Sequence, residues 1–194
     1  MTRAAKQASW RAGWLRTAER ITSPNCGSRP ARAQVDLIVV HSISLPPGEY
    51  GNGAIRALFT NRLEWDAHPY YQRLRGLRVS SHFVITRAGH VQQYVSCAHR
   101  AWHAGASHYR GRGACNDDSI GIELEGLEGD AFTNAQYRAL TALCSALVRR
   151  YPIGYIAGHE HIAPGRKHDP GARLHWQRLS RAFAGSGIVF PPGA

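Results

Sequence analysis

A short apolar run in the first third of the chain, Asp36-Leu37-Ile38-Val39-Val40-His41, decides the fold. Its length and its β-branched residues are typical of a buried strand, and it ends in a histidine. Farther along, residues 119–125 read Ser-Ile-Gly-Ile-Glu-Leu-Glu and alternate in polarity. This alternation predicts a second strand, with isoleucine and leucine on one face and Glu123 and Glu125 on the other.

Further strands and helices alternate with these two runs along the chain. We predict strands near residues 81–86, 91–95 and 155–158, and helices near residues 54–59, 134–151 and 174–184. The long helix has the clearest start, because Thr133 and Gln136 have the spacing of a capping box. Residues 1–33 and 97–116 are predicted to be irregular. This order of elements predicts one α/β domain with a mixed central β-sheet flanked by helices.

We place this domain at residues 13–186, between a basic N-terminal arm of residues 1–12 and a C-terminal tail of residues 187–194. The first nine or so residues of the arm are expected to be disordered. The four cysteines lie at long and irregular spacings, which are not those of a zinc ribbon or a disulfide scaffold. We therefore predict reduced and mostly buried thiols.

The charge of the chain restricts the kinds of partner that it is expected to bind. The formal net charge is +11, and residues 1–32 hold seven basic residues against one acid, Glu19. Such a surface suits an anionic partner, but the chain has no basic helix or basic-aromatic stripe, so we expect no nucleic acid. No run approaches the roughly 20 apolar residues that cross a bilayer. With no apolar segment after the basic N-terminus, we expect a cytoplasmic protein that binds no membrane. The oligomeric state does not follow from the sequence.

Several histidines lie where an α/β fold places a ligand site. His41 and His159 each end a predicted strand, and Asp169 follows ten residues after the second of them. A zinc ion takes three nitrogen or oxygen ligands and leaves a fourth position for water, so these residues are candidate ligands. Four other histidines compete with them on sequence grounds, namely His82, His103, His161 and His168.

A zinc hydrolase also needs a base and a positive charge near the oxyanion. Glu123 and Glu125 are both candidates for the base, because they share one face of a predicted strand. Lys167 lies two residues before Asp169, and it is one of only two lysines in the chain. A loop that brought Asp169 to a metal would therefore bring Lys167 with it.

At these residues the chain resembles the cytoplasmic 1,6-anhydro-N-acetylmuramyl-L-alanine amidases, the AmpD group of the zinc amidases. The resemblance covers roughly residues 13–183 and rests on long motifs in a fixed order. They include residues 37–41 (LIVVH), 43–51 (ISLPPGEYG), 101–105 (AWHAG), 119–126 (SIGIELEG), 158–159 (GH), 166–167 (RK) and 169–171 (DPG).

The resemblance implies a peptidoglycan-recognition-like fold and one Zn²⁺ per chain, held by His41, His159 and Asp169. It implies that Glu123 is the catalytic glutamate and that Lys167 steadies the oxyanion. The expected reaction is hydrolysis of the bond between N-acetylmuramic acid and the L-alanine of a muropeptide. In this family the reaction belongs to peptidoglycan recycling and removes fragments that signal β-lactamase induction.

The resemblance also implies a set of residues lining the substrate cleft, namely Arg78, Trp102, Tyr109 and Arg166. The chain departs from the family at Ser42 and Ala114, where an asparagine and an arginine are expected, so its substrate preference within the class stays open. Two alternatives also remain. One is a peptidoglycan-fragment-binding module without catalysis, and the other is a secreted amidase that acts on intact wall.

Overall fold

The computed structural model describes residues 10–193 of the chain. Its centre is a six-stranded sheet in the order β12-β5-β11-β6-β7-β3. The strands are β3 (Glu19–Arg20), β5 (Leu37–Ile43), β6 (Phe83–Ile85), β7 (Val91–Gln93), β11 (Ser119–Glu125) and β12 (Tyr155–Gly158). Strands β12, β5, β11 and β6 run parallel, whereas β7 is antiparallel to β6. The predicted mixed central sheet is therefore confirmed.

The two strands first identified in the sequence lie side by side in the middle of this sheet. β5 and β11 pair in parallel, with Leu37 opposite Ser119 and His41 opposite Glu123. Every residue of β11 is buried, so its glutamate face is not a solvated surface. Parallel strands are covered on both faces, which explains why the apolar run in β5 is nearly continuous.

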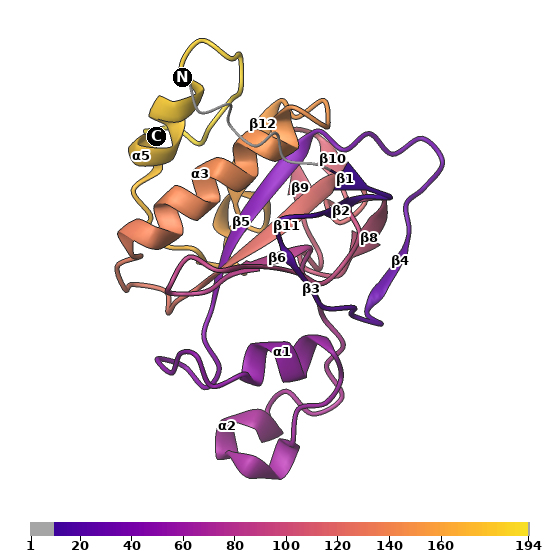
Figure 1. The fold of residues 1–194 in the computed structure, drawn as a ribbon, viewed down its shortest axis with the longest axis vertical. Helices are drawn as coiled ribbons and strands as arrows, with labels where there is room; N and C mark the ends of the chain where they lie inside the picture. Colours follow the sequence, from indigo (N-terminus) through magenta and orange to yellow (C-terminus); the bar gives the residue numbers. More distant parts are fainter. Residues whose placement is uncertain (1–9, 194) are drawn as a thin grey trace, which may run out of the picture.

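Helix α3 (Asn134–Val148) covers one face of the sheet, as Figure 1 shows. Thr133 and Gln136 form the predicted capping box at its start. Leu140 and Leu147 are fully buried and belong to the same core cluster as Ile120 of β11. The helix predicted near residues 174–184 is shorter in the structure. It consists of α5 (Trp176–Ser180), which is followed directly by the 3₁₀ helix η2 (Arg181–Phe183).

A smaller helical unit lies at one end of the sheet (Figure 1). It contains the predicted helix α1 (Ala54–Phe59), together with the unpredicted η1 (Trp65–Ala67) and α2 (Pro69–Gln72). Leu58 and Tyr71 of this unit share a second core cluster with Val84 of β6. This packing fixes the helical unit beside the carboxyl ends of the parallel strands.

The prediction that residues 1–33 are irregular is wrong in part, because four short strands interrupt the described part of this segment. β1 (Trp10–Arg11) and β2 (Trp14–Leu15) form a hairpin, β3 joins the main sheet, and β4 (Cys26–Ser28) pairs with β8 (His99–Ala101). Residues 1–9 of the predicted basic arm lie outside the described residues. β3 and β4 pair with strands more than 70 residues away, which local sequence patterns do not reveal.

The segment 97–116 is likewise less irregular than predicted. Besides β8 it contains a hairpin of β9 (His108–Tyr109) and β10 (Arg112–Gly113). The prediction for the cysteines is confirmed: all four are free, and three of them are buried. Over residues 10–193, no helix has the length and apolar character required to span a membrane.

Candidate active site

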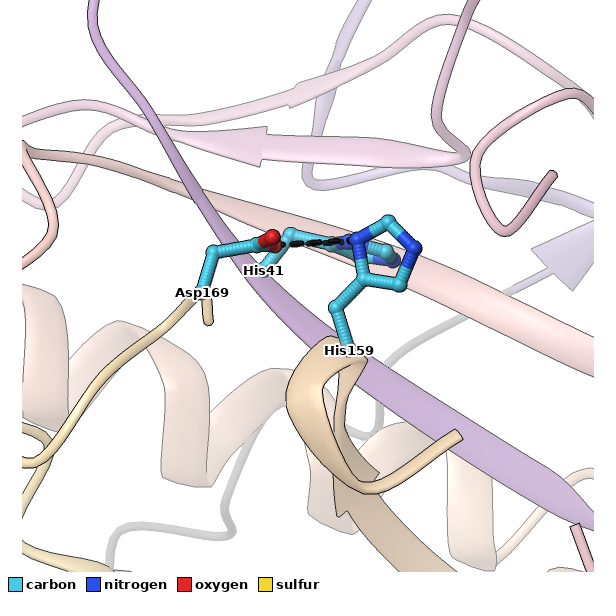
Figure 2. A group of neighbouring side chains, drawn as sticks. All are labelled: His41, His159 and Asp169. Atoms are coloured by element: carbon cyan, nitrogen blue, oxygen red, sulfur yellow. Dashed lines mark hydrogen bonds and ion pairs between the residues drawn. The ribbon is translucent and has the colours of Figure 1, made fainter. Parts of the chain in front are cut away.

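Three side chains meet at the carboxyl ends of β5 and β12 (Figure 2). His41 comes from β5, His159 opens the short helix α4 (His159–Ile162) directly after β12, and Asp169 comes from the following loop. Strands β12 and β5 pair in parallel with Gly158 opposite Val40, so both histidines leave the sheet at the same edge. A Cβ on Gly158 would lie 2.8 Å from the Pro170 ring, so only glycine lets the loop that carries Asp169 pack this closely.

The three groups present their donor atoms to one another. Nδ1 of His41 lies 2.9 Å from Nδ1 of His159 and 3.2 Å from Oδ2 of Asp169, and Nδ1 of His159 lies 3.1 Å from the same oxygen. Two ring nitrogens facing each other at this distance need a shared proton or a cation between them. Ligands of tetrahedral zinc, with bonds of about 2.1 Å, are separated by roughly 3.4 Å. The donor types and spacing therefore fit a metal ion such as zinc.

The structure separates the other candidate histidines from this centre. His161 accepts a hydrogen bond from the Gly158 N–H at 3.0 Å and packs its ring against Trp176. His168 is exposed. His82 is buried and accepts a hydrogen bond from the Gly121 N–H. His103 lies behind His41, with its Nδ1 2.9 Å from the Nε2 of His41.

The surroundings of the candidate ligands shift their pKa values. Burial lowers the pKa of His41 to about 4, although the hydrogen bond with Asp169 opposes this effect. Burial alone would raise the pKa of Asp169, but the hydrogen bonds with His159 and His41 outweigh it and hold that pKa far below its usual value. A neutral imidazole and an ionised carboxylate are the forms that bind a metal.

The two glutamates of β11 have different surroundings, although both are buried. Glu125 is occupied by the backbone, since it accepts hydrogen bonds from the N–H groups of Gly51 at 2.6 Å and Arg87 at 3.0 Å. Glu123 lies opposite His41 and lines the cavity next to the candidate ligands. Burial and the negative charge of Asp169 raise the pKa of Glu123 well above its usual value, while Lys167 opposes this rise. A carboxylate whose pKa is raised holds a proton more readily than an ordinary glutamate, which suits a group that takes up a proton.

A cavity of about 380 Å³ opens over this centre. One end is polar and contains the three candidate ligands, Glu123 and Lys167. The rest of the lining is mostly apolar and forms an apolar wall, to which the helical unit and the segment after it contribute most. This apolar wall includes Leu45, Leu58, Tyr70, Leu74, Leu77, Val79 and Trp102. Leu77 is 43% exposed, which is unusual among the large apolar side chains of this chain. The cavity can thus take a ligand with an apolar surface and a polar bond to be cleaved.

The residues predicted to line a substrate cleft lie in different places. Trp102 lines the cavity. Arg78 is exposed and lies outside the lining, although its neighbours Leu77 and Val79 belong to it. Tyr109 packs edge-on against Tyr155, with ring centroids 5.9 Å apart.

Arg166 is engaged with backbone carbonyls rather than with the cavity. It donates hydrogen bonds to the carbonyls of Ala104 and Ala106, each at 2.7 Å. Of the two departures from the family pattern, Ser42 lines the cavity, whereas Ala114 lies outside it in the left-handed region with φ 53°.

The part of the apolar wall that Tyr70, Leu74 and Leu77 form was not predicted from the sequence. Their spacing of four and three residues is that of one helical face, and this spacing is the feature of the sequence that could have indicated the wall. The segment was not predicted as a helix because α2 spans only four residues and continues as turns.

Comparisons with known proteins identify relatives of this chain. Residues 31–172 match the family model described as N-acetylmuramoyl-L-alanine amidase. The chain is 51% identical to the 1,6-anhydro-N-acetylmuramyl-L-alanine amidase AmpD of Citrobacter freundii over 169 residues, which cover 86% of this chain and 90% of the relative. The corresponding AmpD of Escherichia coli strain K12 is 50% identical, with coverage of 86% and 92%.

Among solved structures, the crystal structure of a selenomethionine derivative of AmpD superposes with a TM-score of 0.86 at 50% identity. It covers 89% of this chain and 97% of the other. A more distant neighbour is the amidase AmiD of Escherichia coli in complex with anhydro-N-acetylmuramic acid-L-Ala-D-γ-Glu-L-Lys. It has a TM-score of 0.59 and 28% identity, and the match covers 79% of this chain and 60% of AmiD.

Proposed function

The chain belongs to the N-acetylmuramoyl-L-alanine amidase family and is a hydrolase of that class, and we propose that it cleaves the amide bond between 1,6-anhydro-N-acetylmuramic acid and L-alanine in muropeptides. One observation carries the proposal. Two histidine nitrogens and an aspartate oxygen converge beside a buried glutamate, at the polar end of an otherwise apolar cavity.

In this proposal His41, His159 and Asp169 hold one zinc ion. Their donor atoms are two imidazole nitrogens and one carboxylate oxygen, a set that catalytic zinc sites use. A zinc ion held there would polarise the scissile carbonyl and lower the pKa of a water molecule.

Glu123 is the proposed general base and acid. It would take a proton from the attacking water and return it to the amine of the departing L-alanine, as its raised pKa allows. Lys167, which lines the same end of the cavity, would place its ammonium charge near the oxyanion of the tetrahedral intermediate. Glu125 is given no role in the reaction, because backbone N–H groups occupy its carboxylate.

The apolar wall would receive the sugar ring. Trp102 and Leu77 offer apolar surfaces of the kind against which sugars pack, and the cavity leads from them to the polar end. Arg78, at the rim of this wall, would attract the carboxylates of the stem peptide. The AmiD neighbour is a complex with a muramyl peptide of this kind, which supports the substrate class.

The proposed setting is the recycling of cell-wall fragments in the cytoplasm, with an influence on β-lactamase induction. The relatives that support it are amidases named for the 1,6-anhydro form of the sugar. Fractionation of cells and the level of anhydro-muropeptides in a deletion strain would test this part of the proposal.

The competing function is a binding module without catalysis. Against it, the complete set of candidate ligands, Glu123 and Lys167 lie in one cavity. The test is incubation of the zinc-loaded protein with an anhydro-muramyl tripeptide, followed by mass spectrometry of the free peptide. We expect cleavage that is lost after chelation of zinc and in Glu123→Gln. Binding of the peptide without cleavage by the zinc-loaded wild type would favour the binding module.

A further inference from the structure

His103 and Ala104, which are not candidate ligands, contact both candidate histidines on the side that faces away from the proposed metal site. Each histidine uses Nδ1 toward the metal centre, which leaves its Nε2 facing away. Nε2 of His41 lies 2.9 Å from Nδ1 of His103, and Nε2 of His159 lies 3.2 Å from the carbonyl oxygen of Ala104. Two consecutive residues therefore contact both rings at their second nitrogen.

The donor and acceptor roles in this arrangement follow from the chemistry of imidazole. A histidine that offers the Nδ1 lone pair to a cation carries its proton on Nε2, so Nε2 must donate. The carbonyl of Ala104 can only accept, and it is suited to His159. The partner of His41 must also accept, so His103 must present an unprotonated Nδ1 and carry its own proton on Nε2.

The next contact is consistent with this assignment. Nε2 of His103 lies 3.2 Å from the hydroxyl oxygen of Ser119, which can accept its proton. The Ser119 hydroxyl in turn donates to the carbonyl oxygen of Cys115. Since the Cys115 carbonyl can only accept, Ser119 must donate to it and accept from Nε2 of His103. Nδ1 of His103 then accepts from Nε2 of His41. The chain of hydrogen bonds leaves a lone pair on Nδ1 of His41, at the metal centre.

The position of the dipeptide is itself fixed. The side-chain oxygen of Asn116 accepts hydrogen bonds from the N–H groups of both His103 and Ala104, at 3.1 and 2.8 Å. Nη2 of Arg166 donates a second hydrogen bond to the Ala104 carbonyl at 2.7 Å. The same nitrogen lies 3.4 Å from Nε2 of His159, but the N–H groups of both side chains can point to this carbonyl, which accepts two hydrogen bonds. His103 also packs against the bare backbone of Gly121, where a Cβ would lie 2.6 Å from its ring. Ala104 is fully buried and His103 is 9% exposed where it lines the cavity, so water has little access to these contacts.

We propose that His103 is a positioning residue, whose Nδ1 accepts the Nε2 proton of His41 and so fixes the tautomer in which His41 binds the metal. Ala104 does the same for His159 through its backbone carbonyl. This inference rests on the proposed metal site. Partners of this kind orient metal-binding histidines, and their loss typically weakens metal affinity.

Two substitutions of nearly equal shape separate the hydrogen bond from packing. In His103→Asn the amide oxygen can occupy the place of Nδ1 and accept from His41, whereas His103→Leu fills the same space without an acceptor. Zinc affinity would be measured by competition with a chromophoric chelator. We expect His103→Leu to bind zinc about 10–100-fold more weakly than the wild type, and His103→Asn to stay within about threefold of it.

The outcomes distinguish this role from the metal site. A wild type that fails to bind zinc would overturn the metal site. If the wild type binds zinc, equal affinities of the leucine and asparagine variants, whether both retained or both lost, would overturn the role of His103. Thermal unfolding of the zinc-free variants checks that each is folded.

A second measurement needs no substitution. Long-range ¹H–¹⁵N spectra of the zinc-loaded wild type report which ring nitrogen of each histidine is protonated. We expect the proton on Nε2 in both His41 and His103. A spectrum with the His103 proton on Nδ1 would overturn the proposal even if neither variant folds.

Discussion

The close contact between Gly121 and His103 gives a prediction whose size follows from the structure. A Cβ added at Gly121 would lie 2.6, 2.7 and 2.8 Å from Cγ, Nδ1 and Cδ2 of the His103 ring. The ring is held at both nitrogens, by His41 at 2.9 Å and by Ser119 at 3.2 Å, so it cannot move away without losing a hydrogen bond.

We expect Gly121→Ala to lower the free energy of unfolding by about 1–3 kcal/mol, the usual cost of overpacking a core. For a domain of this size, each kcal/mol lowers Tm by roughly 2–4 °C. Gly154→Ala is the matched control, because no heavy atom lies within 4 Å of a Cβ built there and its φ is not positive. That substitution should be neutral or slightly stabilising.

The assay is urea unfolding of the zinc-free proteins, followed by a zinc titration of each. Displacement of the His103 ring should also weaken zinc binding in Gly121→Ala and leave it unchanged in Gly154→Ala. The reasoning would be refuted if both variants matched the wild type in stability and in zinc affinity. It would also be refuted if the two substitutions destabilised the protein equally.

Three further predictions concern other parts of the molecule. Glu123→Gln should lower kcat by a factor of about 10²–10⁴ and leave zinc affinity unchanged. Glu125→Gln should mainly lower stability, because its carboxylate accepts backbone hydrogen bonds. Equal kcat values in the two variants would contradict the roles given to these residues. Burial and the charge of Arg29 lower the pKa of His82 to about 3. Below pH 6.5 the unfolded chain therefore binds a proton that the folded chain does not, and stability should fall by about 1.4 kcal/mol per pH unit down to pH 3. Urea unfolding of chelator-treated His82→Asn between pH 4 and 7 should show a slope smaller by one proton than that of the wild type. Trp102→Ala should raise KM for a muropeptide by roughly tenfold or more with a smaller change in zinc affinity, since it removes apolar surface from the cavity wall; an unchanged KM would exclude Trp102 from the substrate contact.

The helices and strands that were predicted correctly are those whose sequence signals lie within the element or directly beside it. α3 begins at its capping box, and β11 and β12 have their predicted bounds, because apolar periodicity and start signals are local. The strands of residues 10–28 were not predicted. β1 and β2 are two residues long and too short to show a period, and β3 and β4 pair with strands more than 70 residues away. The apolar wall near Leu77 was not predicted because α2 spans only four residues, although Tyr70, Leu74 and Leu77 have helical spacing.

The residues of the candidate site were likewise predicted in part from the sequence and in part resolved only by the structure. Strand ends placed His41 and His159 at one edge of the sheet, but the residues alone left four other histidines and both glutamates open. The structure separated them by their hydrogen bonds. His161 accepts from the backbone of Gly158, while the carboxylate of Glu125 is held by two backbone N–H groups.

The sequence by itself determined the class of fold, the central strands and, through resemblance, the family. It did so because strand and helix periods, caps and contiguous motifs are written in neighbouring residues. Only the tertiary structure decided which ring nitrogens face the proposed metal site and which residues hold them there. Those facts depend on distances of about 3 Å between atoms from residues 118 and 128 positions apart in the chain. They also depend on the backbone of residues 103 and 104, which Asn116 and the more distant Arg166 hold in place.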